Sequence, residues 1–181
     1  MTLPGKLALI ILPCWLASSA PLLAQDYAEA RARIVDLQAR YTFAMDFNDP
    51  QAYAAVFAED GVLDWAGGEV VGREAIQTFM QDGVYNLSRN AQAGAWAATT
   101  RHFITNQVIE VEGDTARAWT YWFQVNNNAA DRSASYGLFG HYEDELALID
   151  GEWLFTRRAI FNEGIPNRNR AGTPNPVTKP R

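Results

Sequence analysis

The chain has 181 residues, of which 48% are hydrophobic, 12% aromatic and 20% charged, a balance typical of one globular domain rather than a disordered or coiled-coil protein. Its formal net charge of −6 argues against a protein that binds nucleic acid through a general basic surface. One cysteine and two histidines exclude a disulfide framework and a cysteine-rich zinc site, so we expect no metal centre.

Residues 1–24 have the pattern of a secretory signal peptide. Lys6 supplies a positive charge, Leu7 to Ala20 form an apolar stretch, and Ala24 is a small residue at the predicted cleavage point before Gln25. An uncleaved N-terminal anchor is the alternative. Cleavage of 24 residues from 181 would leave 157 residues without cysteine, which suits the bacterial periplasm or exterior, with no attachment to the membrane.

The mature chain opens with a predicted helix. Apolar residues recur at three- and four-residue steps from Ala30 to Met45, which places them on one helical face. The sequence Asn48-Asp49-Pro50 then predicts a helix end and a new start. Asn48 tolerates a left-handed C-cap, Asp49 can cap the next helix, and Pro50 suits a first turn.

A shorter helix, a strand and a third helix are predicted next. The second helix ends at Asp60-Gly61, and its apolar side is expected to carry Tyr53, Val56 and Phe57. Residues 62–66 indicate a short strand, and a third helix begins after Gly72, with inward side chains Ile76, Phe79 and Met80. Residues 86–99 predict a long loop that could cover a site.

From residue 101 the pattern changes to strands, over residues 101–112, 115–126, 135–149 and 152–162. Gly113-Asp114 and Asp150-Gly151 are strong hairpin signals between them. Helices followed by consecutive antiparallel strands predict an α+β fold, in one domain over residues 25–163. The remaining residues 164–181 contain four prolines and four cations, so we expect a flexible, extended basic tail.

Three side chains are candidates for catalysis. A carboxylate at Asp46, buried at the negative end of the first helix dipole, would become a better general base. His102 opens a strand and could orient a carboxylate or transfer protons, and Tyr41 could polarise a substrate oxygen. Strict alternation places His102 on one face with Ile104, Asn106 and Val108. Each has a purely structural alternative. Asp46 could be an ordinary turn residue, His102 a core histidine whose nitrogens are hydrogen-bonded, and Tyr41 a core tyrosine.

Both faces of the predicted strands are aromatic, so we expect one face to line a pocket and the other to form an interface. The residues predicted to bind a hydrophobic small molecule there are Trp119, Tyr121, Tyr142 and Arg157. Arg157 and Arg158 alternate, so one of them should face inward and pair with a carboxylate or a substrate anion. A filled core with a dimer face is the alternative. His141 is out of phase with Tyr142, which favours a surface or interface role.

Five stretches of the chain resemble the SnoaL-like branch of the nuclear transport factor 2-like superfamily. They are IVDLQARYTFAMD (34–46), YAAVFAEDG (53–61), GREAIQTF (72–79), RHFITN (101–106) and GHYEDELALIDGEW (140–153). The resemblance covers about residues 26–162. It implies a cone in which helices close a strongly curved, mainly antiparallel sheet around a pocket, assembled as a homodimer or homotrimer.

Within the superfamily the chain most resembles the scytalone dehydratases, bile acid 7α-dehydratases and hexachlorocyclohexane dehydrochlorinases. The resemblance implies that Asp46 and His102 form a catalytic dyad and that Tyr41, five residues before Asp46, matches a tyrosine of the bile acid enzymes. We therefore expect a cofactor-independent lyase that acts on hydrophobic small molecules, including polycyclic ones. A non-catalytic exported carrier and a ketosteroid-isomerase-like isomerase are the alternatives.

Overall fold

The computed structural model describes residues 20–82, 99–127, 129–169 and 172–177. Its elements are α1 (Ala20–Asp46), α2 (Pro50–Ala55), β1 (Phe57–Trp65), β2 (Gly68–Val71), α3 (Arg73–Asp82), β3 (Thr100–Glu112), β4 (Thr115–Asn126), β5 (Ser135–Ile149) and β6 (Glu152–Asn162). Most of the predicted leader and all but Thr99 of the predicted loop 86–99 lie outside the described residues.

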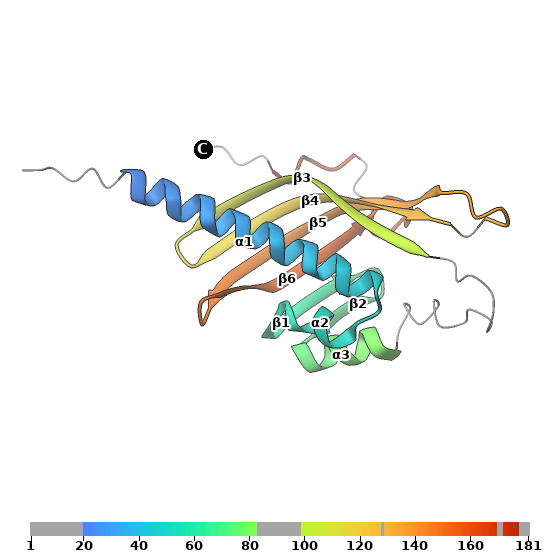
Figure 1. Cartoon of the computed structure of the whole chain (residues 1–181), viewed down its shortest axis with the longest axis horizontal. Helices are drawn as coiled ribbons and strands as arrows, with labels where there is room; N and C mark the ends of the chain where they lie inside the picture. The colour runs from blue at the N-terminus through green and yellow to red at the C-terminus, as the bar shows by residue number, and fades with distance from the viewer. Residues whose placement is uncertain (1–19, 83–98, 128, 170–171, 178–181) are drawn as a thin grey trace, which may run out of the picture.

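The strands form one mixed sheet in the order β2-β1-β6-β5-β4-β3, in which only β1 and β6 run parallel among the pairs described. Helix α1 crosses one face of this sheet, and α2 and α3 lie beside β1 and β2 at one end (Figure 1). We call the face covered by α1 the inner face and the opposite one the outer face. The predicted α+β architecture, with N-terminal helices packed on a mainly antiparallel sheet, is confirmed.

The two predicted hairpin turns join the strands as expected. Asp150 and Gly151 have φ angles of 50° and 81° between β5 and β6, the pair of positive values that a type I′ turn requires. Gly113, with φ of 58°, turns the chain between β3 and β4. These turns fix the antiparallel order β3-β4 and β5-β6, because each connects strands that are adjacent in the sheet.

The second helix is shorter than predicted, and the first strand is longer. Helix α2 ends at Ala55, and β1 begins at Phe57, which pairs in parallel with Phe155 of β6. The expected helix end at Asp60-Gly61 is therefore wrong. A Cβ atom at Gly61 would lie 2.9 Å from the Phe155 carbonyl oxygen, so this close approach of the two strands requires glycine. The partner strand is about a hundred residues away in sequence, which is why local periodicity missed the pairing.

Strand β3 contains a bulge that changes which side chains face inward. Thr105 pairs with Tyr121 and Val108 with Trp119, so one more residue is present in β3 than in β4, and Asn106 has a positive φ of 51°. Asn106 and Val108 therefore lie on the outer face. The strict alternation that placed them beside His102 is wrong beyond the bulge.

The inner face carries a buried ion pair in addition to apolar side chains from α1 and the sheet. Arg158 donates from Nε and Nη2 to the two carboxylate oxygens of Asp144, at 2.8 and 2.7 Å, and neither side chain is exposed. Gln38 of α1 donates to the same carboxylate at 3.1 Å. These hydrogen bonds link α1 to β5 and β6. The pairing also offsets the cost of burying the two charges.

The first residues of the predicted tail form turns that pack against the sheet rather than extending away from it. Arg168 donates to the carbonyl oxygens of Ile160 and Asp64 at 2.9 Å each, and its guanidinium lies 4.9 Å from the centre of the Phe161 ring. Ile165 lines the pocket described below. No helix within the described ranges is both long and apolar enough to cross a membrane.

Candidate active site

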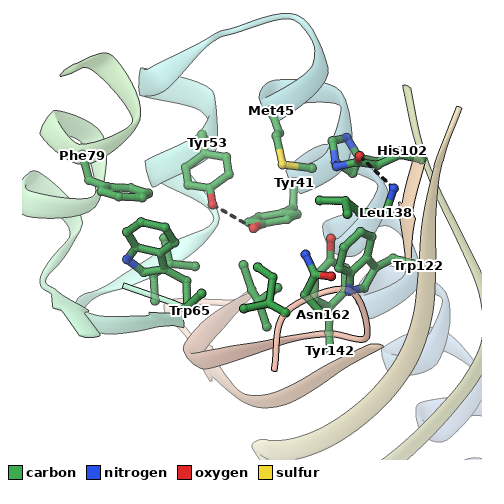
Figure 2. A pocket seen from close by; sticks show the side chains of 15 residues that line it. Tyr41, Met45, Tyr53, Trp65, Phe79, His102, Trp122, Leu138, Tyr142 and Asn162 are labelled. Carbon is green, nitrogen blue, oxygen red and sulfur yellow. Dashed lines mark hydrogen bonds between the residues drawn. The ribbon is translucent and has the colours of Figure 1, made fainter. Parts of the chain in front are cut away.

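A cavity of about 170 Å³ lies between the three helices and the inner face of the sheet. Figure 2 shows His102 and Trp122 on one side of it, Phe79 and Trp65 on the other, and Tyr41 and Tyr53 between them. The described lining consists of Tyr41, Met45, Tyr53, Leu63, Trp65, Ala66, Phe79, His102, Trp122, Gln124, Leu138, Tyr142, Ile160, Asn162 and Ile165. This described lining includes no aspartate, glutamate, lysine or arginine side chain.

Asp46 and His102 meet beside this cavity. The Nδ1 atom of His102 lies 2.5 Å from one carboxylate oxygen of Asp46, and the backbone N–H of His102 donates to the other oxygen at 2.8 Å. The side chains are only 5% and 6% exposed. Both carboxylate oxygens are thus bound to one residue, which fixes the plane of the imidazole ring as well as its position.

The end of α1 and the start of β3 position this dyad. Asp46 is the last residue of α1, and Arg101, next to His102 on β3, donates to the Asp46 carbonyl oxygen at 3.2 Å. The same arginine lies over the Phe47 ring, 4.5 Å from its centre. The negative end of the helix therefore meets a cation and a backbone N–H, which offset the unfavourable position of a carboxylate there.

The second ring nitrogen of His102 contacts a residue that the sequence did not single out. The side-chain nitrogen of Gln124, on β4, lies 2.8 Å from His102 Nε2. Cross-strand pairing with His102 could have suggested Gln124, but only after the β3–β4 register was known. With Asp46 on Nδ1 and Gln124 on Nε2, both edges of the imidazole are hydrogen-bonded.

Tyr41 shares a hydrogen bond with a second tyrosine. The hydroxyl oxygens of Tyr41 and Tyr53 are 2.7 Å apart, and both side chains line the cavity. Burial raises the pKa of the Tyr41 phenol above its ordinary value, while the nearby Arg158 cation and the Tyr53 hydrogen bond oppose that increase. The sequence placed Tyr53 only on an apolar helix face, without a role at the site. Together the two hydroxyls can donate a hydrogen bond to a substrate oxygen.

The inward arginine is Arg158 and not Arg157. The Arg158 guanidinium lies 4.1 Å from the centre of the Tyr41 ring and 4.2 Å from that of Tyr142. Burial by itself would lower the pKa of Arg158, but the charge and hydrogen bonds of Asp144 outweigh it, so its pKa lies above the ordinary value. A permanent cation therefore lies directly behind two pocket aromatics.

Arg157, which we expected to bind substrate, lies away from the cavity. Its Nη2 atom donates to Asp64 of β1 at 2.6 Å and to Glu69 of β2 at 2.8 Å. The residue follows the alternation of β6, in which Arg158 faces inward, so Arg157 cannot face the same way. Its ion pairs connect β6 to the edge of the sheet.

Two of the three aromatic residues predicted to bind substrate lie on the outer face. Tyr142 lines the cavity, but Trp119 and Tyr121 do not, and Tyr121 is 57% exposed. Trp122 takes the inward position on β4, because it alternates with Tyr121. His141 also lies on the outer face, where its ring stacks on Phe161 at 4.8 Å.

Among the described residues, no three or more histidine, cysteine, aspartate or glutamate side chains are arranged to hold a metal ion. The acidic residues near the cavity are already bound: Asp46 by His102, and Asp144 by Arg158. The described side chains at the cavity offer proton transfer by the imidazole and hydrogen bonding by the tyrosine pair.

Residues 26–159 of the chain match the family of proteins with a SnoaL-like domain. No match was found among curated proteins. Among solved structures, a nuclear transport factor 2-like protein with a cystatin-like fold from Novosphingobium aromaticivorans has a TM-score of 0.67 and 22% identity, covering 84% of this chain and 96% of its own.

Two further structures are similar to the chain. A candidate scytalone dehydratase from Novosphingobium aromaticivorans has a TM-score of 0.61 and 24% identity, covering 77% of this chain and 87% of its own. A protein from Catenulispora acidiphila, solved in complex with S-DNPA, has a TM-score of 0.60 and 25% identity. The match covers 76% of this chain and 96% of that protein. These structures share the fold described above.

Proposed function

Because the chain belongs to the SnoaL-like domain family and has the nuclear transport factor 2-like fold, as its sequence predicted, we propose that it is a cofactor-independent lyase. The observation that carries this proposal is the Asp46–His102 contact of 2.5 Å at the edge of an aromatic cavity. We further propose that residues 1–24 direct export, so that the active protein starts at Gln25.

In the proposed reaction, His102 Nε2 takes a proton from a carbon next to a carbonyl group. The electron pair of the broken C–H bond forms a carbon–carbon double bond, while the bond from the neighbouring carbon to hydroxide or halide breaks and the leaving group keeps its electron pair. The imidazolium then gives its proton to the departing hydroxide, which becomes water, or to solvent when the leaving group is halide. Asp46 stabilises the imidazolium through Nδ1, as a carboxylate behind a histidine base does in other enzymes.

Tyr41 and Tyr53 supply the second part of the proposed mechanism. Negative charge builds on the substrate's carbonyl oxygen when the proton leaves. A fixed hydroxyl donor stabilises this charged state more than it stabilises the uncharged ground state. The Arg158 cation behind the Tyr41 ring favours the same charge. The proton acceptor, His102, and the hydrogen-bond donors, Tyr41 and Tyr53, line the same cavity, as an elimination requires.

The size and polarity of the cavity support a small, uncharged ring substrate. A dry cavity of about 150 Å³ holds one benzene molecule, so about 170 Å³ accommodates one ring fully, and a larger ring system would have to extend through the mouth. The described lining offers aromatic faces and no cation for a substrate anion. The relative from Catenulispora acidiphila, solved with a small ligand, also supports small-molecule binding.

A thermal-shift screen of the protein beginning at Gln25 tests this proposal. The screen compares chlorinated rings, aromatic polyketides and hydroxysteroids, and we expect the melting temperature to rise by several degrees with a one- or two-ring member. Product analysis of each hit then separates the alternatives. Loss of water or halide supports a lyase, whereas a product that keeps its hydroxyl indicates an isomerase. Binding without any product indicates a carrier and contradicts the proposal.

A further inference from the structure

The nitrogen that receives the substrate's proton in the proposed mechanism is hydrogen-bonded in the resting protein. Gln124 lies directly opposite His102 in the β3–β4 pairing, so both side chains leave the same face of the sheet. The Gln124 amide nitrogen is 2.8 Å from His102 Nε2. An amide N–H is a donor, so a ring nitrogen that pairs with it must be unprotonated.

A bulge in β5 sets the orientation of this amide in the resting protein. Phe123 pairs with Phe139 and Val125 with Tyr136, so Gln124 faces two residues of β5 instead of one. Among them, Leu138 donates its backbone N–H to Gln124 Oε1 at 3.3 Å. Since the amide oxygen accepts there, the amide NH₂ group faces His102. The proton of a neutral His102 is then on Nδ1, toward Asp46.

We propose that Gln124 is a positioning residue that caps the lone pair of the base until substrate displaces it. This inference rests on the proposed elimination. After proton transfer, His102 Nε2 carries a hydrogen and needs an acceptor. The Gln124 oxygen provides it if the carboxamide turns about its last bond and gives up its 3.3 Å bond from the Leu138 N–H. One side chain thus donates to the neutral base and accepts from its protonated form.

Nitrogen NMR of the two histidines tests the cap without any substrate. In the wild-type protein we expect a neutral His102 with its proton on Nδ1, and in Gln124→Met the same tautomer with a shifted Nε2 signal. Gln124→Glu has nearly the same shape but only accepts, so it should leave His102 protonated on both nitrogens at neutral pH. Asn126→Leu removes an amide from the same strand, one that binds Thr100 instead, and should leave the His102 spectrum unchanged.

A wild-type proton on Nε2, or a Gln124→Glu spectrum like that of the wild type, would overturn the cap. So would an Asn126→Leu spectrum altered as in Gln124→Met, because the effect would then come from the strand and not from the amide. These readings need no turnover, so they stand even if no substrate reacts and the lyase proposal fails.

Kinetics on a substrate from the screen test the second half of the inference. Gln124→Met should lower KM, because substrate no longer competes with the amide, and lower kcat, because the imidazolium loses its acceptor, each by roughly three- to tenfold, the value of one hydrogen bond. Gln124→Glu should lower kcat by about 100-fold or more, since the base has no free lone pair. Unchanged KM and kcat in Gln124→Met would show that Gln124 only fills space.

Discussion

Tyr41 is enclosed by groups that act on its hydroxyl in opposite directions. It is fully buried, it shares a hydrogen bond with Tyr53, and the Arg158 guanidinium lies 4.1 Å from its ring centre. Burial has the largest effect and raises the pKa of the phenol above 10.0, although the cation and the hydrogen bond oppose it. Tyr41 therefore keeps its proton at neutral pH and acts as a donor.

This pKa predicts how stability depends on pH. The folded state holds the Tyr41 proton to a higher pH than the unfolded state, so the contribution of Tyr41 to stability is fully present below about pH 10 and is lost as the pH rises above it. Tyr41→Phe should cost about 1 kcal/mol at neutral pH through the lost hydrogen bond and should show a shallower decline at high pH. Urea unfolding across this range measures both. Tyr136→Phe, at an exposed tyrosine, is the control, and parallel curves for Tyr41→Phe and wild type would refute the assignment.

The sequence indicated the residues of the dyad but not the contacts that complete the site. Asp46 broke the helix-end charge rule and His102 interrupted an apolar strand face, so each could be selected from local pattern. Tyr53 and Gln124 break no local rule, so no local pattern marks them. The role of Tyr53 comes from its contact with Tyr41 on the neighbouring helix α1, and that of Gln124 from its contact with His102 on the neighbouring strand β3; both contacts depend on tertiary structure.

At the level of elements, strands β5 and β6 are joined by the Asp144–Arg158 pair at the centre of the inner face. Removal of one partner of a buried pair leaves an uncompensated charge, whereas an exposed pair contributes little. Arg157, next to Arg158, makes its ion pairs with a side chain that is 33% exposed. The two neighbouring arginines therefore form a natural comparison of inward and outward charge.

Arg158→Met should lower the free energy of unfolding by about 3–5 kcal/mol, because Asp144 is left buried without its cation. Arg157→Met should cost at most about 1 kcal/mol. The double variant Arg158→Met/Asp144→Leu should recover part of the first loss, since no charge remains buried. Chemical denaturation measures all three. Equal costs at the two arginines would contradict this account of the inner face.

The elements that the sequence predicted best are those whose signals are local. The α1 helix and the strands after residue 100 follow from periodicity, and the β5–β6 hairpin from Asp150-Gly151. Strand β1 was missed in part because its pairing with β6 is not local, and β2 because it is only four residues long. The bulge in β3 depends on a positive φ at Asn106, which alternation does not report.

At the scale of the whole molecule, the outer face of β3, β4 and β5 has exposed aromatic side chains. Phe103 is 48% exposed, Phe139 58%, and Phe103 stacks on Phe123 at 5.3 Å. Exposed apolar clusters of this kind commonly mark contact surfaces. We therefore retain the proposal that the protein assembles as a homodimer or homotrimer and place the contact on this face.

Light scattering coupled to size-exclusion chromatography tests this assembly. The protein should elute at two or three times its chain mass, and Phe103→Glu together with Phe139→Glu should convert it to monomers, because burial of these carboxylates is unfavourable. Phe43→Glu is the matched control, since Phe43 is 66% exposed but belongs to α1. A monomeric wild type, or dissociation by Phe43→Glu alone, would contradict the proposed surface.

The central claim is that His102, supported by Asp46, is the base. The most direct measurement is kcat for His102→Gln and Asp46→Asn on a substrate identified by the screen. His141→Gln serves as the control, because His141 is the chain's second histidine and lies on the outer face. We predict that both dyad variants keep substrate binding and lose roughly 10²- to 10⁴-fold in kcat, with little change in His141→Gln. Full turnover by His102→Gln would contradict the account.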